Sequence, residues 1–473
     1  MTAIKAGNSI NAQMVTFICG FDEKTLSSLA VKNAVSAILD TLAVTAAGRA
    51  EQAVMSLEAS LPVYANESLA QHKIWREDDA ALLLGTASHA LDYDDVSMVT
   101  VCHPSAPVFS SLCAAICFGD TPLKPSGREL IAALCVGTEV LIRIGQAMGF
   151  RHYELGFHPT ATLGNIGATA ALARLKGLSL EQTGHALSIA ASMSGGLRNN
   201  FGSMVKPLHV GLAAANGVRA VQLALAGVTG AADIFEASGF LHAFSGGSTD
   251  TWPPSVLLGE PLVLESPGFE QKRYACCYIL HKIIEASVAL RNEHSLTLDH
   301  IKSALVKLPH GGMRPLNHPY PRSGLHGKFS APYAVIASVL DGSITLNSFV
   351  DEAVLRPEVQ SRLTDIEVIE EGAVSNEGSD LGNSPVTVSL TLVDGRTVSK
   401  TVTIAPGSPA DPITLEQMEK KWVDCFSIGR ADLSEAEARR LFAEGCELDT
   451  STSVVAWLAE ATGRNLPSLK KDA

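Results

Sequence analysis

A short stretch of the chain, HALDYDDVSMVTVCHPSAP, concentrates side chains that can accept or donate protons. It covers residues 89–107 and holds three aspartates and a histidine that precedes a proline: Asp92, Asp94, Asp95 and His103. Only 18% of the residues in the whole chain are charged, so this density is unusual for the sequence. Carboxylates act as bases, and a histidine exchanges its proton near neutral pH. The stretch therefore predicts general acid-base chemistry.

Four further motifs carry cations or imidazoles, and each is bordered by glycine or proline. They are RHYELGFHPTATLG with Tyr153 and His158, RNNFGSMVKPLH with Arg198, Lys206 and His209, QKRYACC with Lys272, and GLHGKFS with Lys328. Lysine and arginine bind carboxylates, and so does the start of a helix, which we expect at Pro159 or Thr160. The motifs together predict a site for a small anionic substrate.

Taken singly, each of these residues also has an ordinary structural explanation. An aspartate commonly caps a helix or pairs with a basic residue, and a lone histidine is more often a satisfied interior or surface group. Lys206 or Lys272 alone is most simply a solvated charge, and Tyr153 alone a packing residue. The functional interpretation depends on the coincidence of several such motifs in one chain.

The elements that must position these motifs are mostly helices. Apolar residues recur at helical spacing over 25–47, 128–148, 160–175, 180–193 and 209–226. Aromatic residues make up only 5% of the chain, and glycine and alanine are frequent in these stretches, which favours close contacts between helices. We therefore expect a mainly α protein with a large helical domain.

The pattern changes after about residue 268. Strands are predicted over 301–308 and 365–370, and VTVSLTLVDGRTVSKTVTI reads as a hairpin that turns at Asp394 and Gly395. Helices are predicted between them and again after residue 407. With 473 residues the chain is long enough for two domains. We expect a helical domain from 1–268 and 407–473, and a smaller α+β domain from 269–406.

The composition excludes several classes of partner. The formal net charge of −13 argues against nucleic acid and against an anionic membrane surface, because both require a positive face. The nine cysteines lack C-x-x-C spacing, and no export signal is evident, which predicts reduced thiols in a cytoplasmic protein.

Other site chemistries are less well supported by the sequence. It contains no H-E-x-x-H or EF-hand pattern, no G-x-G-x-x-G or P-loop and no G-x-S-x-G elbow. The aspartates could bind a divalent cation, but DYDDVSM offers no further regular acidic ligand. We predict neither a cofactor nor a metal.

The ordered set HALDYDDV, HPS, GFHPTATLG, NFGSMVKPLHVG, KRYACC and GLHGKFS resembles the MmgE/PrpD family over residues 25–440. That family includes 2-methylcitrate dehydratases, cis-aconitate decarboxylases and iminodisuccinate epimerase. The resemblance implies a large all-helical domain with an inserted, smaller α+β lid domain. It also implies a homodimer and an active site in the cleft between the domains.

The motifs carry over to single residues. Asp92 matches the first aspartate of D-[FY]-[ND]-D, His103 the histidine of H-P-S, and His158 the histidine of G-[FW]-H-P. Lys206 matches the lysine of K-P-L-H, and Lys272 the lysine of K-x-[YF]-x-x-C. The resemblance implies that these residues are catalytic.

Five further residues complete the predicted site. Tyr153 lies in a stretch that resembles the epimerase, where such a tyrosine is a candidate proton carrier. Ser97 falls near the family position that often carries a threonine in the decarboxylases. We expect Ser97, Arg198, His209 and Lys328 to bind substrate.

The leading functional hypothesis is a cofactor-independent lyase, a dehydratase or decarboxylase, that passes through an enolate-like intermediate of a small di- or tricarboxylate. The alternative is an epimerase of an imino- or hydroxy-dicarboxylate such as iminodisuccinate, which would need two proton carriers on opposite faces. A non-catalytic polycarboxylate-binding protein is a third hypothesis. It would need the cations but not the whole acid-base set.

Overall fold

The computed structural model describes residues 9–62, 75–119, 121, 123–236, 238–249, 252–253, 256–371 and 381–463. The chain divides into two compact units. The first comprises Met1–Leu197, Pro207–Phe269 and Thr414–Ala473, and the second comprises Arg198–Lys206 and Glu270–Ile413. The end of the chain thus belongs to the same unit as its beginning.

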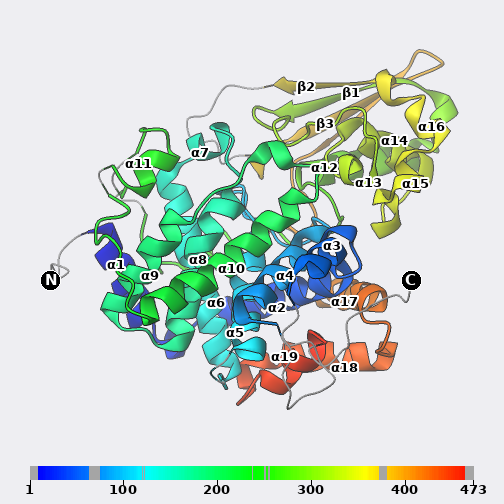
Figure 1. The fold of residues 1–473 in the computed structure, drawn as a ribbon. Helices are drawn as coiled ribbons and strands as arrows, with labels where there is room; N and C mark the ends of the chain where they lie inside the picture. Colours follow the sequence, from blue (N-terminus) through cyan, green and yellow to red (C-terminus); the bar gives the residue numbers. More distant parts are fainter. Residues whose placement is uncertain are drawn as a thin grey trace. The chain divides into compact units, whose positions relative to one another are not determined.

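The first unit is helical (Figure 1). Its helices are α1 (Ile10–Gly20), α2 (Ser28–Gly48), α3 (Gln52–Ser60), α4 (Glu77–Ala90), α5 (Ser105–Phe118), α6 (Gly127–Met148), α7 (Arg151–Glu154), α8 (Pro159–Lys176), α9 (Leu180–Ser192), most of α10 (Val205–Leu225), α11 (Phe240–Phe244), α17 (Leu415–Gly429), α18 (Glu435–Cys446) and α19 (Val455–Ala461). The long helices predicted from the sequence are confirmed within a few residues of their bounds, and α8 begins at Pro159.

Local sequence explains where several of these helices begin. A serine or threonine that accepts a hydrogen bond from the third helical residue, whose side chain bonds back, forms a capping box. This pattern starts α6, α9, α17 and α18, through Ser126 and Glu129, Ser179 and Gln182, Thr414 and Gln417, and Ser434 and Glu437. Each box satisfies amide groups that the first turn would otherwise leave open.

Close packing of α6 on α8 forms part of the core of the first unit. An added Cβ at Gly137 of α6 would lie 2.7 Å from the carbonyl oxygen of Gly167, and one at Gly167 of α8 would lie 2.9 Å from that of Gly137. The two backbones can approach this closely only because both residues lack a side chain. The α5 helix, which follows the acid-base stretch, also packs on α8.

The second unit combines a small sheet with short helices. The sheet has the order β2 (Ile366–Glu371), β1 (Ile301–Pro309), β3 (Val386–Leu392), β4 (Thr397–Val402), with β1 and β2 parallel and the other pairs antiparallel. Figure 1 shows α12 (Ile279–His294) and α14 (Ala331–Asp341) beside this sheet. The shorter helices are α13 (Gly324–Gly327), α15 (Asp351–Val354) and α16 (Pro357–Gln360).

The predicted mainly α fold with a small sheet is therefore confirmed, including the hairpin of β3 and β4. The second unit also contains Arg198–Lys206, a segment that lies within the bounds predicted for the helical domain. The predicted role of the α+β domain as a lid stays a prediction.

Two helices, α2 and α6, are long and apolar enough to cross a membrane by length and composition. Of their most apolar windows, 72% and 94% are buried inside the protein. Buried core helices pass the same test, so this is weak evidence for a membrane span.

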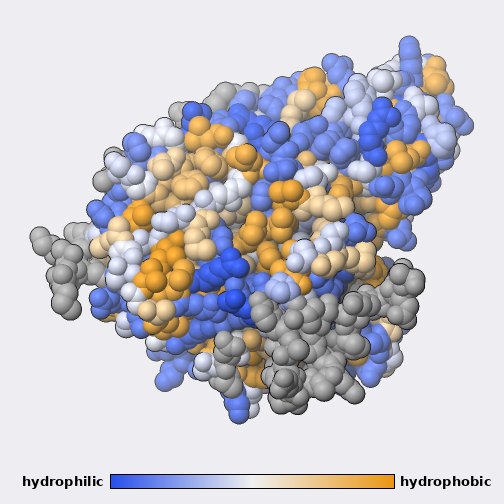
Figure 2. Space-filling model, in the orientation of Figure 1, coloured by the Kyte–Doolittle hydropathy of each residue, from blue (hydrophilic) through white to orange (hydrophobic). Residues whose placement is uncertain are grey.

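Apolar side chains also lie on the surface, mixed with polar ones (Figure 2). On α10, Leu212, Leu223 and Leu225 are more than 40% exposed. Single exposed apolar residues are normal for a globular protein. The predicted homodimer therefore stays a prediction.

Candidate active site

The acid-base stretch connects two core helices of the first unit. His89 lies in the last turn of α4, which ends at Ala90, and Ser105 begins α5. The loop between the helices, residues 91–104, is called the site loop; it carries the three aspartates and His103, and all of them are buried. Because α4 and α5 pack against each other, the two ends of this loop are held close together. The fold therefore gathers the polar side chains of the loop in one buried place.

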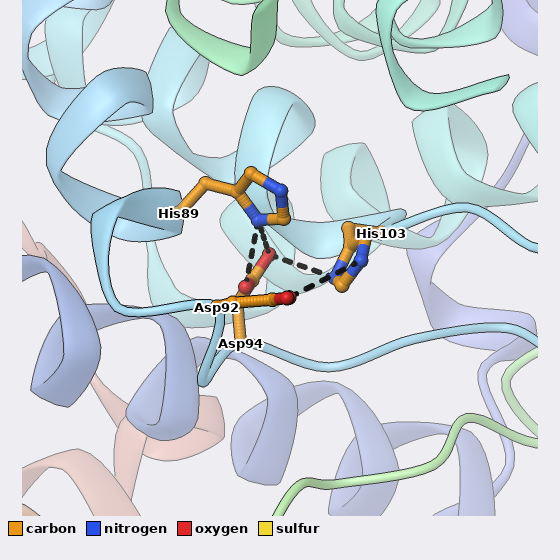
Figure 3. Close-up of side chains that lie close together, drawn as sticks. All are labelled: His89, Asp92, Asp94 and His103. Carbon is orange, nitrogen blue, oxygen red and sulfur yellow. Dashed lines mark hydrogen bonds and ion pairs between the residues drawn. The ribbon is translucent and has the colours of Figure 1, made fainter. Parts of the chain in front are cut away.

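Asp94 lies between two imidazoles (Figure 3). Its carboxylate oxygens are 2.8 and 2.9 Å from Nδ1 of His89, and Oδ2 is 3.2 Å from Nδ1 of His103. Burial by itself would raise the pKa of Asp94, but the two imidazoles hold it well below its usual range. Asp94 is therefore an acceptor that keeps its negative charge.

The other nitrogen of His103 faces a second carboxylate. Nε2 of His103 is 3.7 Å from Oδ1 of Asp92, and Nδ1 is also 2.8 Å from the backbone oxygen of Asp95. A carbonyl oxygen only accepts, so Nδ1 carries the proton. Negative charge close to both ring nitrogens favours the imidazolium form of His103. The ring is thus placed to donate the proton on Nε2.

Two residues of this loop, Asp92 and Val101, have positive φ angles, which residues other than glycine rarely adopt. The φ angle of Asp92 is 52° and that of Val101 is 53°, and for a β-branched residue such a value is unusual. Within the same loop, Ser97 and Cys102 exchange backbone hydrogen bonds of 2.7 and 3.3 Å. Strained conformations persist where the surrounding structure holds them in place, and they gather at functional sites.

The first turns of α5 and α8 hold the base of the loop. The amide of His103 donates to Oγ1 of Thr160 at 3.0 Å, and the amide of Ser105 donates to Asp95 at 3.2 Å. Burial raises the pKa of Asp95 well above its usual range, although its hydrogen bonds with Ser105 act in the opposite direction. Asp94 and Asp95 are neighbours, but their environments shift the pKa values of the two carboxyl groups in opposite directions.

Two more histidines continue the cluster. His158 directly precedes α8, and its ring is stacked 6.0 Å from that of His89. Nδ1 of His158 lies 3.1 Å from Nδ1 of His209 on α10. One of these two nitrogens must carry the shared proton, since neutral imidazoles pair as donor and acceptor. The first unit thus brings together Asp92, His103, His158 and His209 of the predicted site.

The predicted cations belong to the second unit. Lys206, Lys272 and Lys328 are all buried there, and Arg198 begins a short 3₁₀ helix. The ammonium of Lys206 lies over the rings of Phe201 and Phe329, 5.0 and 5.5 Å from their centres. That of Lys328 donates to the backbone oxygen of Ala275 at 3.2 Å. Their assignment to substrate carboxylates stays a prediction.

Tyr153 and Ser97 are both buried in the first unit. The ring of Tyr153 in α7 lies 5.4 Å from that of Phe150. The hydroxyl of Ser97 is buried and has no hydrogen-bond partner among the described residues. A buried hydroxyl without a partner is energetically costly. The predicted contact of Ser97 with substrate stays a prediction. Proton transfer by Tyr153 stays a prediction.

His89 is not among the predicted site residues, and Asp94 is predicted only as one of three aspartates that could act as acceptors or bases, although both lie in the selected stretch. The spacing of five residues from His89 to Asp94 crosses the end of α4, so no helical periodicity predicts their contact. Their density within one short stretch was the only available signal.

The donor types of the cluster would also suit a transition-metal ion. One ligand atom each from His89, Asp92, Asp94 and His103 lies within 4.8 Å of the others. Nitrogen and carboxylate oxygen are ligands of Zn²⁺ and similar ions. The contacts between Asp94 and the two imidazoles account for the same proximity without a bound ion.

The chain matches the family models of two domains that belong to the same protein family. Residues 12–252 match the MmgE/PrpD N-terminal domain, and residues 274–448 match the MmgE/PrpD C-terminal domain. The chain belongs to the MmgE/PrpD family.

Curated relatives carry one activity in their names. The cis-aconitate decarboxylase of Mus musculus is 29% identical over 436 residues, which cover 88% of this chain and 86% of the relative. That of Homo sapiens is 28% identical, with 88% and 87% covered, and that of Aspergillus terreus is 27% identical, with 72% and 73% covered. The family and these relatives support a lyase-type reaction.

Proposed function

We propose that this protein is a cofactor-independent lyase of small di- or tricarboxylates, and that cis-aconitate is its first candidate substrate. The observation that carries the proposal is the buried His103 ring with a carboxylate near each nitrogen. A binding protein for anions has no need of this arrangement, since acidic groups repel its ligand. The names of the relatives supply the candidate substrate.

Decarboxylation of cis-aconitate makes limited demands on the protein. The carbon-carbon double bond lies between the carbons β and γ to the leaving carboxylate. When CO₂ leaves, the electron pair of the broken carbon-carbon bond forms a new double bond between the α and β carbons. The old double bond shifts its electrons to the γ carbon, which takes up one proton. The reaction needs one proton donor and fixed positive charge near the developing anion.

His103 is the proposed proton donor. Asp92 and Asp94 favour its imidazolium form, and the Nδ1 hydrogen bond to the Asp95 carbonyl fixes the ring orientation. After the proton on Nε2 is transferred, the neutral imidazole recovers a proton from solvent. His158 is the second candidate for proton transfer, because its pairing with His209 orients its ring in the same way.

The proposed role of Lys206, Lys272 and Arg198 is to bind the substrate carboxylates and stabilise the developing enolate-like anion. Lys328, His209 and the hydroxyl of Ser97 would add contacts to the remaining polar groups. We also propose that the second unit serves as a lid and that the protein is a cytoplasmic homodimer.

The same residues could instead catalyse a dehydration, in which a base removes a proton and an acid protonates the leaving hydroxyl. An epimerase would exchange the α-proton of its substrate without net conversion. These reactions have different products, so one experiment separates them.

The experiment is incubation of the purified protein with 2-methylcitrate, citrate, cis-aconitate and iminodisuccinate in deuterated water, followed by proton NMR. Loss of CO₂ or water from one substrate would support the lyase. Deuterium uptake without conversion would favour the epimerase. Binding of a polycarboxylate with no exchange and no conversion would contradict both and favour the non-catalytic alternative.

A further inference from the structure

A lysine from the C-terminal segment of the first unit contacts the site loop. Lys421 of α17 is buried, and its ammonium is 2.6 Å from Oδ1 of Asp40 on α2. The same ammonium donates to the backbone oxygen of Tyr93 at 2.9 Å and lies 3.7 Å from the centre of the Tyr93 ring. One buried cation thus contacts a carboxylate, a carbonyl and an aromatic face.

The contact falls at a critical position in the loop. Tyr93 lies between Asp92 and Asp94, the two carboxylates that flank His103. The backbone of Asp92 adopts a φ of 52°, which an L-residue holds only if the surroundings stabilise it. The hydrogen bond to the Tyr93 carbonyl holds the peptide group that joins Tyr93 to Asp94, one residue after Asp92.

Stability alone is a weak explanation for this buried ion pair. The side chains of Lys421 and Asp40 are 4% and 0% exposed, so both charges have lost nearly all their water. Replacing a buried ion pair with apolar residues of similar volume is often neutral or stabilising. An ion pair kept in such a place therefore calls for a specific role, and the contact with Tyr93 supplies one.

We infer that Lys421 is a positioning residue for the lyase reaction: held by Asp40, it fixes Tyr93 and thereby sets Asp92 and Asp94 against His103. This inference rests on the proposed function for its activity readout. It gives α17, more than 300 residues further along the chain than the loop, a direct part in the geometry of the site.

The first test is Lys421→Met in the full-length protein, assayed on the substrate that the wild-type enzyme converts. We expect kcat to fall by about 10- to 100-fold with little change in KM, because misplacement of catalytic groups by about 1 Å has effects of this size. The pH profile of kcat should also shift, since the carboxylates that favour the charged His103 have moved. A variant with normal kcat and pH profile would overturn the inference.

A matched control separates positioning from general destabilisation. Lys176→Met removes another lysine with a short ion pair in the first unit, at 2.6 Å from Glu77, whose contacts do not involve the site loop. We expect it to lower thermal stability but to leave kcat and its pH profile unchanged.

A second variant keeps the test sharp if Lys421→Met alone unfolds. The pair Asp40→Asn with Lys421→Met removes both charges, so no lone carboxylate stays buried. We expect this double variant to recover stability but not kcat. Recovery of both would show that the ion pair serves the fold alone, and would contradict the inference.

A readout without substrate distinguishes failure of this inference from failure of the proposed function. In ¹⁵N-histidine-labelled protein, the His103 signal can be assigned by its loss in His103→Gln. We expect its titration to shift in the double variant and not in Lys176→Met. An unshifted His103 titration would contradict the positioning role whether or not any polycarboxylate is converted.

Discussion

The carboxylate of Asp94 lies 2.8 Å from Nδ1 of His89 at the end of α4. This contact ties the centre of the site loop to a core helix, and the same carboxylate reaches His103 at 3.2 Å. The three residues form a linked set in which a rigid helix orients a carboxylate, and the carboxylate orients a histidine. Supporting hydrogen bonds of this kind are what hold catalytic groups within the narrow range that chemistry requires.

Asp94→Asn tests this set. The amide keeps the shape of the side chain but loses the charge. Its NH₂ group would face one of the two imidazoles, whose Nδ1 is itself a hydrogen-bond donor. We expect kcat to fall by about 10²- to 10⁴-fold, the usual contribution of a general acid or base. Steady-state kinetics on the converted substrate provide the measurement.

The control for this change is Asp394→Asn, which removes a carboxylate from the β3–β4 turn. Among the ion pairs of the described residues, Asp394 takes part only in the one with Arg396. We expect wild-type kinetics from it. If Asp94→Asn behaves like this control, Asp94 does not support the chemistry.

The buried His152 predicts how stability depends on pH. Burial holds the pKa of His152 at about 4, although its hydrogen bond to the oxygen of Phe244 acts in the opposite direction. The unfolded chain protonates this histidine with a pKa near 6.5, so acid favours the unfolded state. The stability that neutral His152 contributes is complete above about pH 6.5 and is lost as the pH falls towards 4.

When the pH is lowered from 8 to 6, we expect this residue alone to lower the free energy of unfolding by about 1 kcal/mol. The variant His152→Gln, which can still bond Thr162, should show a smaller decrease over that range. Urea unfolding of both proteins at the two pH values provides the comparison. Equal decreases in the two proteins would show that His152 does not stay neutral in the fold.

The close contact of α6 and α8 predicts that a glycine-to-alanine substitution in this contact lowers the stability of the protein. Glycine to alanine normally stabilises a helix by about 1 kcal/mol. At Gly167 an added Cβ would lie 2.9 Å from the Gly137 oxygen, so we expect Gly167→Ala to destabilise the protein by about 1–3 kcal/mol. Thermal unfolding provides the measurement.

Gly20, at the end of α1, is the matched control. It has no atom within 4 Å of an added Cβ, so alanine there should be neutral or slightly stabilising. A Gly167→Ala protein at least as stable as Gly20→Ala would mean that α6 and α8 are not in such close contact.

The proposed proton transfer from His103 predicts that turnover does not depend on a metal ion. Proton transfer requires Nε2 of His103 to be open, and a bound ion would compete for the same donors. We expect turnover to survive dialysis against a strong chelator without loss. Loss of activity on chelation, with recovery on adding Zn²⁺ or another single divalent ion, would reverse this expectation.

The sequence was sufficient for the long elements of the fold. The helices over 128–148 and 180–193 were predictable because each has an apolar repeat and an [S/T]-x-x-[E/Q] start, and the hairpin because Asp394 and Gly395 separate two alternating runs. The membership of 198–206 in the second unit was not predictable. It depends on tertiary contacts, and the local sequence carries no signal for them.

For the candidate site, residue types and density selected a stretch that folds into one buried cluster, but they did not predict the partners within it. His89 and Asp94 meet across a helix end, and Lys421 meets Tyr93 over a separation of 328 residues. Contacts of these kinds follow from the packing of α2, α4 and α17 rather than from any periodic pattern. The opposite pKa shifts of Asp94 and Asp95 have the same origin, because adjacent residues point to different neighbours.

The most direct test of the proposed function is to follow cis-aconitate in deuterated water by proton NMR with wild-type protein and with His103→Gln. We predict that the wild-type protein releases CO₂ and forms the rearranged dicarboxylate with one deuterium on the former γ carbon. The variant should form this product about 10²- to 10⁴-fold more slowly. Equal rates in the two proteins would contradict the assignment of His103 as the proton donor, and no conversion by the wild-type protein would contradict cis-aconitate as the substrate.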